Sequence, residues 1–384
     1  MTYPLKLPSL SVRPIYSIHL STAKSWRGGE NQIWLLARGL IARGQRALVI
    51  APRNAPLLQR CRDAGIPTGA IHPSGELDLV GTARLARLLR REKPDVLHAH
   101  DGHAVLPAKF AAWFRPRALL KLVVHRRTVF ALKGRWKYQG RVDRIIAISA
   151  AVRERLLADG ISDASIRVVF SGMEFPPASV EDGQALRTKL GIGADAIVFA
   201  HAAALTGEKR QQDILRAFAQ TRDALKASTR GDVPKIHLLI AGTGKLEELL
   251  HADARQLGIA DHVHFLGFVT DLRPVWSASN AAIFASEAEG LCTALIEAQA
   301  AGLPAVITRA GGMVEIVADG VSGITTGIGD FVAMAKAMEA LACDREQCKR
   351  MGQAAAQNAR AKFAADRMVD GVLEAYRELV DTKQ

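Results

Sequence analysis

Short apolar segments alternate with longer segments of helical period along most of the chain. In the first half, runs rich in Val, Ile and Leu predict strands, and the segments between them, such as 30–43, repeat apolar residues as an amphipathic helix does. Strands of this composition separated by helices are typical of a parallel sheet covered on both faces. The predicted strands of the first half are 15–20, 46–51, 95–99, 119–125, 144–148 and 166–170.

The alternation stops once and then restarts. Residues 171–182, SGMEFPPASVED, combine two prolines with small and acidic residues and predict a linker. A second set of strands follows, and the helical stretch 366–380 comes after the last of them without indicating where it packs. The second set of predicted strands is 196–202, 235–241, 262–267, 281–285 and 304–308.

This pattern predicts an α/β protein with two Rossmann-like, doubly wound domains that face each other across a cleft. We place the first domain at residues 1–180, the second at 181–365, and a C-terminal helix in 366–384. In such sheets, ligands bind beyond the carboxyl ends of the strands.

Composition excludes several classes of protein. The chain has 384 residues, of which 49% are hydrophobic, so it can bury a sizeable core and is not disordered as a whole. Its apolar runs fall short of the ~20 residues that span a bilayer, and the N-terminus does not resemble a signal peptide. Four cysteines without CxxC spacing predict reduced thiols in a cytoplasmic protein. They are Cys61, Cys292, Cys343 and Cys348.

The positive charge is concentrated in the first half. Residues 1–185 carry 29 Lys and Arg against 14 Asp and Glu, a net charge of +15, whereas residues 186–384 carry 22 against 24, a net charge of −2. This asymmetry favours two domains that meet different partners.

The strongest chemical signal lies in residues 286–304, SEAEGLCTALIEAQAAGLP. Glu289 and Glu297 stand eight residues apart, after an apolar strand and around the start of a predicted helix near Leu291. The first N–H groups of that helix suit a phosphate, and Glu297 can accept hydrogen bonds from vicinal hydroxyls. Two glutamates on a solvated helix face are the alternative, but an Ala-rich, buried helix makes unpaired acids costly.

These residues resemble those of the retaining glycosyltransferases of the GT-B fold, in particular family GT4. The resemblance extends along the chain. It includes Gly28-Gly29-Glu30 after the first strand, the segment 143–174, in which Glu174 stands where an Asp is usual, and 311–315, GGMVE, which resembles a later GG-x-x-E motif.

The resemblance implies transfer of a sugar from a nucleotide-sugar donor with retention of configuration. It implies that Glu289 and His125 orient the transferred sugar, that Gly29 approaches the diphosphate, and that Lys209 neutralises it. The family has an Arg five positions before this Lys, where this chain has Ala204. Either Lys209 and Arg210 carry the charge together, or helix N-termini hold more of the leaving group. The remaining predicted donor-binding residues are Gly290, Leu291, Cys292, Thr293 and Glu297.

Several histidines follow predicted strands. His98 and His100 alternate on one strand and, with His103, have the composition of a metal site. The family instead places such histidines along the acceptor cleft, and the chain has no D-x-D motif, so we expect no metal and no cofactor.

The stretch 109–144 holds eleven Lys and Arg and one Asp, interleaved with aromatic residues. Such a surface suits an anionic membrane or nucleic acid, and a merely solvated basic face is the third possibility. We predict an acceptor or membrane face made of His100, Arg126, Arg127, Arg135 and Lys137, with Trp113, Phe114, Trp136 and Tyr138 as interfacial anchors.

The combined prediction is a glycosyltransferase, peripheral on the inner face of the cell membrane, that uses a UDP-sugar to modify a lipid-linked or lipopolysaccharide-type acceptor. A sugar-nucleotide epimerase of the same fold is the nearest alternative. A nucleic-acid-binding protein is the other, and it explains the basic composition but not the placed glutamates.

Overall fold

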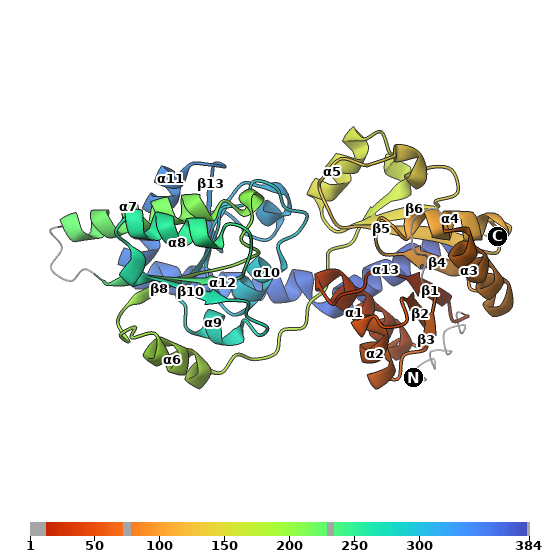
Figure 1. Ribbon diagram of the computed structural model, residues 1–384, viewed down its shortest axis with the longest axis horizontal. Helices are drawn as coiled ribbons and strands as arrows, with labels where there is room; N and C mark the ends of the chain where they lie inside the picture. The colour runs from red at the N-terminus through yellow and green to blue at the C-terminus, as the bar shows by residue number, and fades with distance from the viewer. Residues whose placement is uncertain (1–12, 72–77, 229–233, 382–384) are drawn as a thin grey trace, which may run out of the picture. The chain divides into compact units, whose positions relative to one another are not determined.

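The computed structural model describes residues 13–71, 78–228 and 234–381, and its described part is α/β with two parallel sheets (Figure 1). The predicted class is confirmed. The extreme ends of the predicted first domain and C-terminal helix, residues 1–12 and 382–384, lie outside the described residues.

The first sheet has the strand order β3-β2-β1-β4-β5-β6-β7. From β1 the chain adds β2 and β3 on one side of the sheet, and from β4 onward it adds strands on the other side. Strands β1 and β4, where this order reverses, are hydrogen-bonded neighbours and parallel. Its strands are β1 (Tyr16–Leu20), β2 (Arg46–Ala51), β3 (Thr68–Ala70), β4 (Val96–Ala99), β5 (Lys121–Arg126), β6 (Arg144–Ala147) and β7 (Ile166–Val168).

The second sheet has the order β10-β9-β8-β11-β12-β13 and reverses in the same way between β8 and β11. Its central strands are buried, as their largely apolar composition predicts, although β8 contains His201 and β9 contains His237. The strands are β8 (Ile197–Ala202), β9 (Ile236–Ala241), β10 (Val263–Gly267), β11 (Ala281–Phe284), β12 (Ala305–Thr308) and β13 (Gly323–Thr326).

Helices connect the strands, and several begin at a side chain that accepts a backbone N–H. Asp78 Oδ1 accepts from Gly81 N at 2.9 Å, and Asp330 Oδ1 accepts from Ala333 N at the same distance. The α-helices are α1 (Gly28–Ala42), α2 (Pro56–Asp63), α3 (Leu79–Glu92), α4 (Val105–Trp113), α5 (Ala150–Ala158), α6 (Val180–Lys189), α7 (Gln211–Ala227), α8 (Glu247–Gln256), α9 (Arg273–Ser277), α10 (Thr293–Ala300), α11 (Phe331–Cys343), α12 (Arg345–Phe363) and α13 (Ala365–Val380). The 3-10 helices are η1 (Arg135–Tyr138), η2 (Asp163–Ser165), η3 (Gly207–Lys209), η4 (Ala260–His262) and η5 (Gly311–Glu315).

The chain divides into two compact units. Unit 1 contains residues 1–126, 134–146 and 369–384, and unit 2 contains 127–133 and 147–368. Most of α13 therefore belongs to unit 1, where Tyr376 is fully buried and its hydroxyl bonds His98 Nδ1 at 2.6 Å. The sequence left the packing of the last helix open. The buried Tyr376 side chain shows that this helix packs in unit 1.

The predicted strands are confirmed within about two residues at each end, and the linker is shorter than predicted. Helix α6 already begins at Val180, where Ser179 Oγ accepts from Asp182 N at 3.1 Å. Acidic residues in a first helical turn interact favourably with the helix dipole, so Glu181 and Asp182 start a helix instead of ending a linker. All four cysteines have free thiols, as expected.

Candidate functional site

The loops after β8 and β11 form the candidate donor site of unit 2. These two strands lie side by side, but the chain leaves them toward opposite sides of the sheet. A crevice at the carboxyl ends of such a strand pair is where doubly wound sheets bind ligands. Lys209 follows β8 and Glu289 follows β11, so the fold brings together two residues that the sequence analysis had singled out.

Lys209 and Glu289 form an ion pair between Nζ and Oε1. The hydroxyl of Ser286 donates to the same carboxylate oxygen at 3.1 Å. Burial by itself lowers the pKa of Lys209, but the adjacent Glu289 carboxylate outweighs it, so the pKa is raised above its ordinary value. The amine therefore stays cationic and is held by Glu289 at the crevice, where an anionic ligand can contact it.

Arg210 lies beside this pair and is itself held by carboxylates. It adopts a left-handed backbone conformation, with φ of 52°, at the start of α7. Its Nε donates to Asp213 Oδ2 at 2.7 Å, and Nη1 donates to Glu287 Oε2 at 3.4 Å. The hydrogen bond to Asp213 raises the pKa of Arg210. A phosphate could therefore share Arg210, as predicted, only in competition with the carboxylates of Asp213 and Glu287.

Glycines fix the backbone around Glu289. Gly312 N donates to Glu289 O at 3.0 Å. A Cβ on Gly311 would lie 2.0 Å from Glu289 O, and one on Gly312 would lie 2.3 Å from Gly290 O. No other residue type fits this contact without moving the loop. The GGMVE segment, which resembles the family motif and follows β12, thus packs its backbone against the Glu289–Gly290 loop.

A second glycine pair has the same function for the loop after β8, and the sequence analysis missed it. A Cβ on Gly242 would lie 1.9 Å from Ala203 O, and one on Gly244 would lie 2.3 Å from Leu205 O. The signal was present as two glycines directly after strand β9, in the segment AGTG.

The predicted phosphate cradle lies at the start of α10, which begins at Thr293, two residues later than expected. The side chains of Leu291 and Cys292 are buried, so these two residues offer backbone groups to a ligand. Burial raises the pKa of the Cys292 thiol, which keeps it neutral. The first-turn N–H groups and the positive end of the helix dipole then supply the electrostatics of an anion site.

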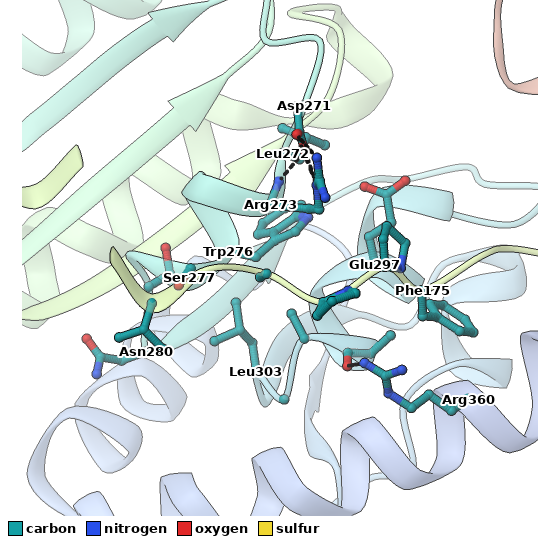
Figure 2. Close-up of a pocket in the computed structure, with 18 of the residues that line it drawn as sticks. Phe175, Asp271, Leu272, Arg273, Trp276, Ser277, Asn280, Glu297, Leu303 and Arg360 are labelled. Carbon is teal, nitrogen blue, oxygen red and sulfur yellow. Dashed lines mark hydrogen bonds and ion pairs between the residues drawn. The ribbon is translucent and has the colours of Figure 1, made fainter. Parts of the chain in front are cut away.

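Glu297 also lines a cavity of about 970 Å³, whose other lining comes from α9, α12, the end of α10 and the segment that precedes α6. Figure 2 shows Glu297 projecting into it between Trp276 and Phe175. Burial raises the pKa of Glu297; the Trp276 indole acts in the opposite direction, and the Asp271 charge adds to the rise. Asp271 is in turn paired with Arg273, with Nη2 to Oδ2 at 2.5 Å. The sequence analysis missed this cavity, whose aromatic and charged lining comes from segments far apart in the chain.

The loops at the reversal point of the first sheet hold the predicted unit 1 residues. Gly29 lies in the first turn of α1, just after β1, and Glu30 Oε2 accepts from Arg27 N at 2.9 Å at that helix start. Asp101, which the sequence analysis did not single out, ties the two loops together. It accepts from Thr22 N at 2.7 Å and from Ala104 N at 2.9 Å.

His125 and His100 are both buried in a cluster of histidines at the carboxyl ends of β1, β4 and β5. The ring of His125 stacks on that of His98, with centroids 5.3 Å apart and an interplanar angle of 8°. Only 3% of His100 is exposed. It therefore cannot form part of an exposed membrane face, and the sequence analysis was wrong to include it in one.

The basic stretch 109–144 is only partly a surface. Arg135 is exposed, whereas Arg126, Arg127 and Lys137 are half-buried. Lys109 is buried, and its Nζ donates to Trp136 O at 2.6 Å. Tyr138 and Arg141 are also buried, so Tyr138 is not an interfacial anchor as expected. Large aromatic side chains do remain exposed at Trp113 (68%), Phe114 (62%) and Trp136 (53%).

Comparison with known proteins decides the family. The sequence model of the family described as Glycosyl transferases group 1 matches residues 182–358, and that of Glycosyltransferase Family 4 matches residues 26–174. The chain belongs to the GT-B glycosyltransferases. This confirms the resemblance inferred from Glu289, Glu297 and the glycine motifs. Both family descriptions are of glycosyltransferases, and neither supports the epimerase or the nucleic-acid-binding alternative.

The relatives of this glycosyltransferase include a protein named for lipopolysaccharide core biosynthesis. The lipopolysaccharide core biosynthesis glycosyltransferase LpsE of Rhizobium meliloti is 26% identical over 76% of this chain and 78% of its own length. The putative glycosyltransferase EpsD of Bacillus subtilis is 30% identical over 54% of this chain, but the match spans only 52% of EpsD. The crystal structure of Anabaena HepE in complex with UDP has the same fold. It superposes with a TM-score of 0.80 over 95% of this chain and 100% of HepE, at 21% identity.

Proposed function

We propose that this glycosyltransferase moves a sugar from a nucleoside-diphosphate sugar, with a UDP-sugar as the first candidate, to a glycan or lipid of the cell envelope. The observation that carries the proposal is the Lys209–Glu289 pair at the crevice of the second sheet, next to the start of α10. The pair supplies a fixed cation where the helix start already favours an anion. The UDP and UDP-glucose complexes of HepE support the choice of donor.

In the proposed complex, the backbone N–H groups of Leu291, Cys292 and Thr293 and the amine of Lys209 meet the diphosphate charge, with Gly290 allowing close approach. Glu297 accepts hydrogen bonds from the ribose hydroxyls, because it stands four residues after Thr293, the first residue of α10, and so lies about one turn from the phosphate-binding helix start. Glu289 holds Lys209 in place and orients the sugar. We retain His125 as a sugar-positioning residue, Gly29 as a phosphate contact and Arg210 as a supporting cation.

Transfer in this proposal proceeds with retention. The bond between the anomeric carbon and the diphosphate oxygen breaks, and the acceptor hydroxyl forms the new bond on the same face of the sugar. The acceptor's proton passes to the leaving diphosphate oxygen, so no protein base is consumed. The protein's contribution is electrostatic: Lys209 and the α10 amides stabilise the negative charge that grows on the leaving group.

The proposed acceptor is a lipid-linked or lipopolysaccharide-type glycan, and the proposed location is peripheral on the inner face of the cell membrane. The name of LpsE supports the acceptor class. Exposed Trp113 and Phe114 at the end of α4 support a membrane surface, with Arg90 of α3 placed over the Phe114 ring at 5.8 Å. In the described residues no helix is long and apolar enough to cross a membrane.

A transfer assay tests the proposal. Untagged protein is incubated with UDP-, GDP- and ADP-sugars and detergent-dispersed envelope glycolipids, and product is followed by mass spectrometry and its anomeric configuration by NMR. We expect one donor class to support transfer with retention, and Lys209→Ala to reduce the rate at least tenfold. Inversion at the anomeric carbon would contradict the same-face course, and hydrolysis of a nucleotide sugar without any transfer would contradict the acceptor class.

A further inference from the structure

Four buried histidines gather in unit 1 at the carboxyl ends of three neighbouring strands. The register of β1 and β4 places His19 directly opposite His98. His98 and His100 are two residues apart along the chain, so both point to the same face of the sheet. His125 comes from β5, the next strand, and α13 reaches β4 through the hydrogen bond between Tyr376 and His98 (Figure 1). Adjacent parallel strands thus direct several imidazoles into one small interior volume.

Three of these rings bring their nitrogens together. One ring nitrogen from each of His19, His98 and His100 lies within 4.8 Å of the nitrogens of the other two. His19 Nδ1 and His100 Nε2 are 2.9 Å apart and share a hydrogen bond. A tetrahedral Zn²⁺ ion with Zn–N distances of about 2.0–2.1 Å separates its ligand nitrogens by roughly 3.4 Å. The measured 2.9 Å and the 4.8 Å limit bracket that separation.

The surroundings orient two of the rings. Ser17 Oγ lies 2.9 Å from His19 Nε2, and the Tyr376 hydroxyl lies 2.6 Å from His98 Nδ1. These contacts engage one nitrogen of each ring and point to His19 Nδ1 and His98 Nε2 as ligand atoms. Hydrogen bonds of this kind to the second ring nitrogen are what fixes the tautomer and orientation of histidines that ligate metals.

All three rings are buried, and a metal ion binds histidine through a neutral imidazole. Three neutral imidazoles leave the ion's charge to be balanced in the fourth position by hydroxide or another small anion, as in sites with three protein ligands.

We propose that His19, His98 and His100 bind one divalent transition-metal ion of the Zn²⁺ type. Nitrogen ligands of this kind select Zn²⁺, Co²⁺ or Cu²⁺ over Mg²⁺, whose preferred ligands are oxygens. The set differs from the one weighed in the sequence, because His103 is exposed on the loop after β4 and His19 takes its place. The site goes beyond the proposed sugar transfer, and all three proposed ligands belong to unit 1.

Cobalt substitution tests the site. Untagged full-length protein is stripped with dipicolinate, titrated with Co²⁺ and then with Zn²⁺, and read by the visible d–d absorption of tetrahedral Co²⁺ and by elemental analysis. We expect one ion per chain, displaced by Zn²⁺. His19→Asn and His100→Asn should abolish the spectrum, whereas the matched control His103→Asn should retain it.

A second variant guards against loss of fold. Tyr376→Phe removes only the hydroxyl that contacts His98 and should weaken metal affinity by about 10–100-fold while the circular dichroism spectrum stays unchanged. The proposal is overturned if the wild type shows no tetrahedral Co²⁺ spectrum, or if His19→Asn, shown to be folded, binds the ion as tightly as the wild type.

Discussion

Glu289 and Glu297 have different surroundings although they stand eight residues apart on one segment. Glu289 is paired with Lys209 and bonded by Ser286, so its charge is compensated within the protein. Glu297 faces a cavity, and burial raises its pKa. A carboxylate in such a place is costly until a ligand donates hydrogen bonds to it. At the residue scale, the two glutamates therefore have separate functions.

Replacing Glu297 by Gln should weaken binding of the nucleoside diphosphate by roughly 10–100-fold, because ribose hydroxyls lose a charged acceptor worth about 1.5–3 kcal/mol. Isothermal titration calorimetry measures the change. Glu248→Gln, on the exposed first turn of α8, is the matched control and should bind as the wild type does. Equal affinity of Glu297→Gln and wild type would remove Glu297 from the donor site.

The raised pKa of Glu297 predicts a pH dependence with a definite sign. As pH falls through that raised pKa, the carboxylate is protonated and donor binding should weaken at a higher pH than an ordinary Glu would give. The folding stability of the ligand-free protein depends on pH in the opposite direction. A raised folded-state pKa of Glu297 favours folding at acid pH, and this contribution is lost as pH rises.

Both effects should disappear in the Glu297→Gln variant. Its donor affinity should change less with pH, and its Tm without ligand should equal or exceed that of the wild type at neutral pH, with the difference shrinking toward acid pH. Calorimetric and thermal-shift pH series measure the two quantities. A wild-type affinity that rises as the pH falls would contradict the assigned function of the carboxylate.

At the scale of elements, the donor site depends on backbone contacts between loops from different strands. Gly311→Ala would place a Cβ 2.0 Å from Glu289 O, at a position whose φ is +49°. We expect a loss of about 1–3 kcal/mol in the free energy of unfolding, beyond the backbone cost, together with weaker donor binding. Urea unfolding measures the stability change.

Gly320→Ala is the matched control for that variant. Gly320 also has a positive φ, of 72°, but a Cβ there would meet nothing within 4 Å. It should therefore show only the cost of the left-handed backbone, about 1–2 kcal/mol, and unchanged donor binding. Equal effects of the two variants would show that the contact with the Glu289 loop is unimportant.

The sequence predicted the long, apolar elements well and the short ones poorly. Strands such as β2 and β9 are mostly apolar and mostly buried, so period and composition were sufficient. The missed strands β3 and β13 are TGA and GITT, short segments at sheet edges with glycine and threonine. Such strands are formed by pairing with a neighbour, and their own composition carries little signal.

The candidate site followed the same division. The meeting of Lys209 and Glu289 was predictable, because each lies in the loop after a recognisable strand. The place of His19 in the histidine cluster was not, since its partners come from a strand about eighty residues later and its own segment reads as an ordinary strand. The cavity around Glu297 likewise depends on Phe175 and Trp276, which no local pattern connects.

At the scale of the whole molecule, the net charge of +15 in residues 1–185 overstates the available basic surface, because Lys109 and Arg141 are buried. Exposed aromatics remain at Trp113, Phe114 and Trp136. Each surface Lys or Arg near an anionic leaflet contributes about 1 kcal/mol. Cations with interfacial aromatics favour reversible binding to anionic bilayers.

We expect the protein to co-sediment with liposomes containing phosphatidylglycerol but not with pure phosphatidylcholine, and to be released at high salt. Changing Trp113, Phe114 and Arg135 to Ser should reduce binding at least fivefold. Leu249→Ser together with Val321→Ser, exposed apolar residues of unit 2, is the control and should have no effect. Equal binding to both liposome types, or none, would leave the basic face without a membrane function.

The central claim is that the crevice of the second sheet binds a nucleoside diphosphate through Lys209, the α10 start and Glu297, without help from Mg²⁺. Calorimetric titration of the wild type with UDP, GDP and ADP, with and without Mg²⁺, tests it most directly, with Lys209→Ala and Glu297→Gln measured alongside. The account predicts that one of the three binds in the micromolar range equally well with and without Mg²⁺, and that each variant weakens it at least tenfold. Binding that requires Mg²⁺, binding that both variants retain, or no binding of any of the three at millimolar concentration would contradict the account.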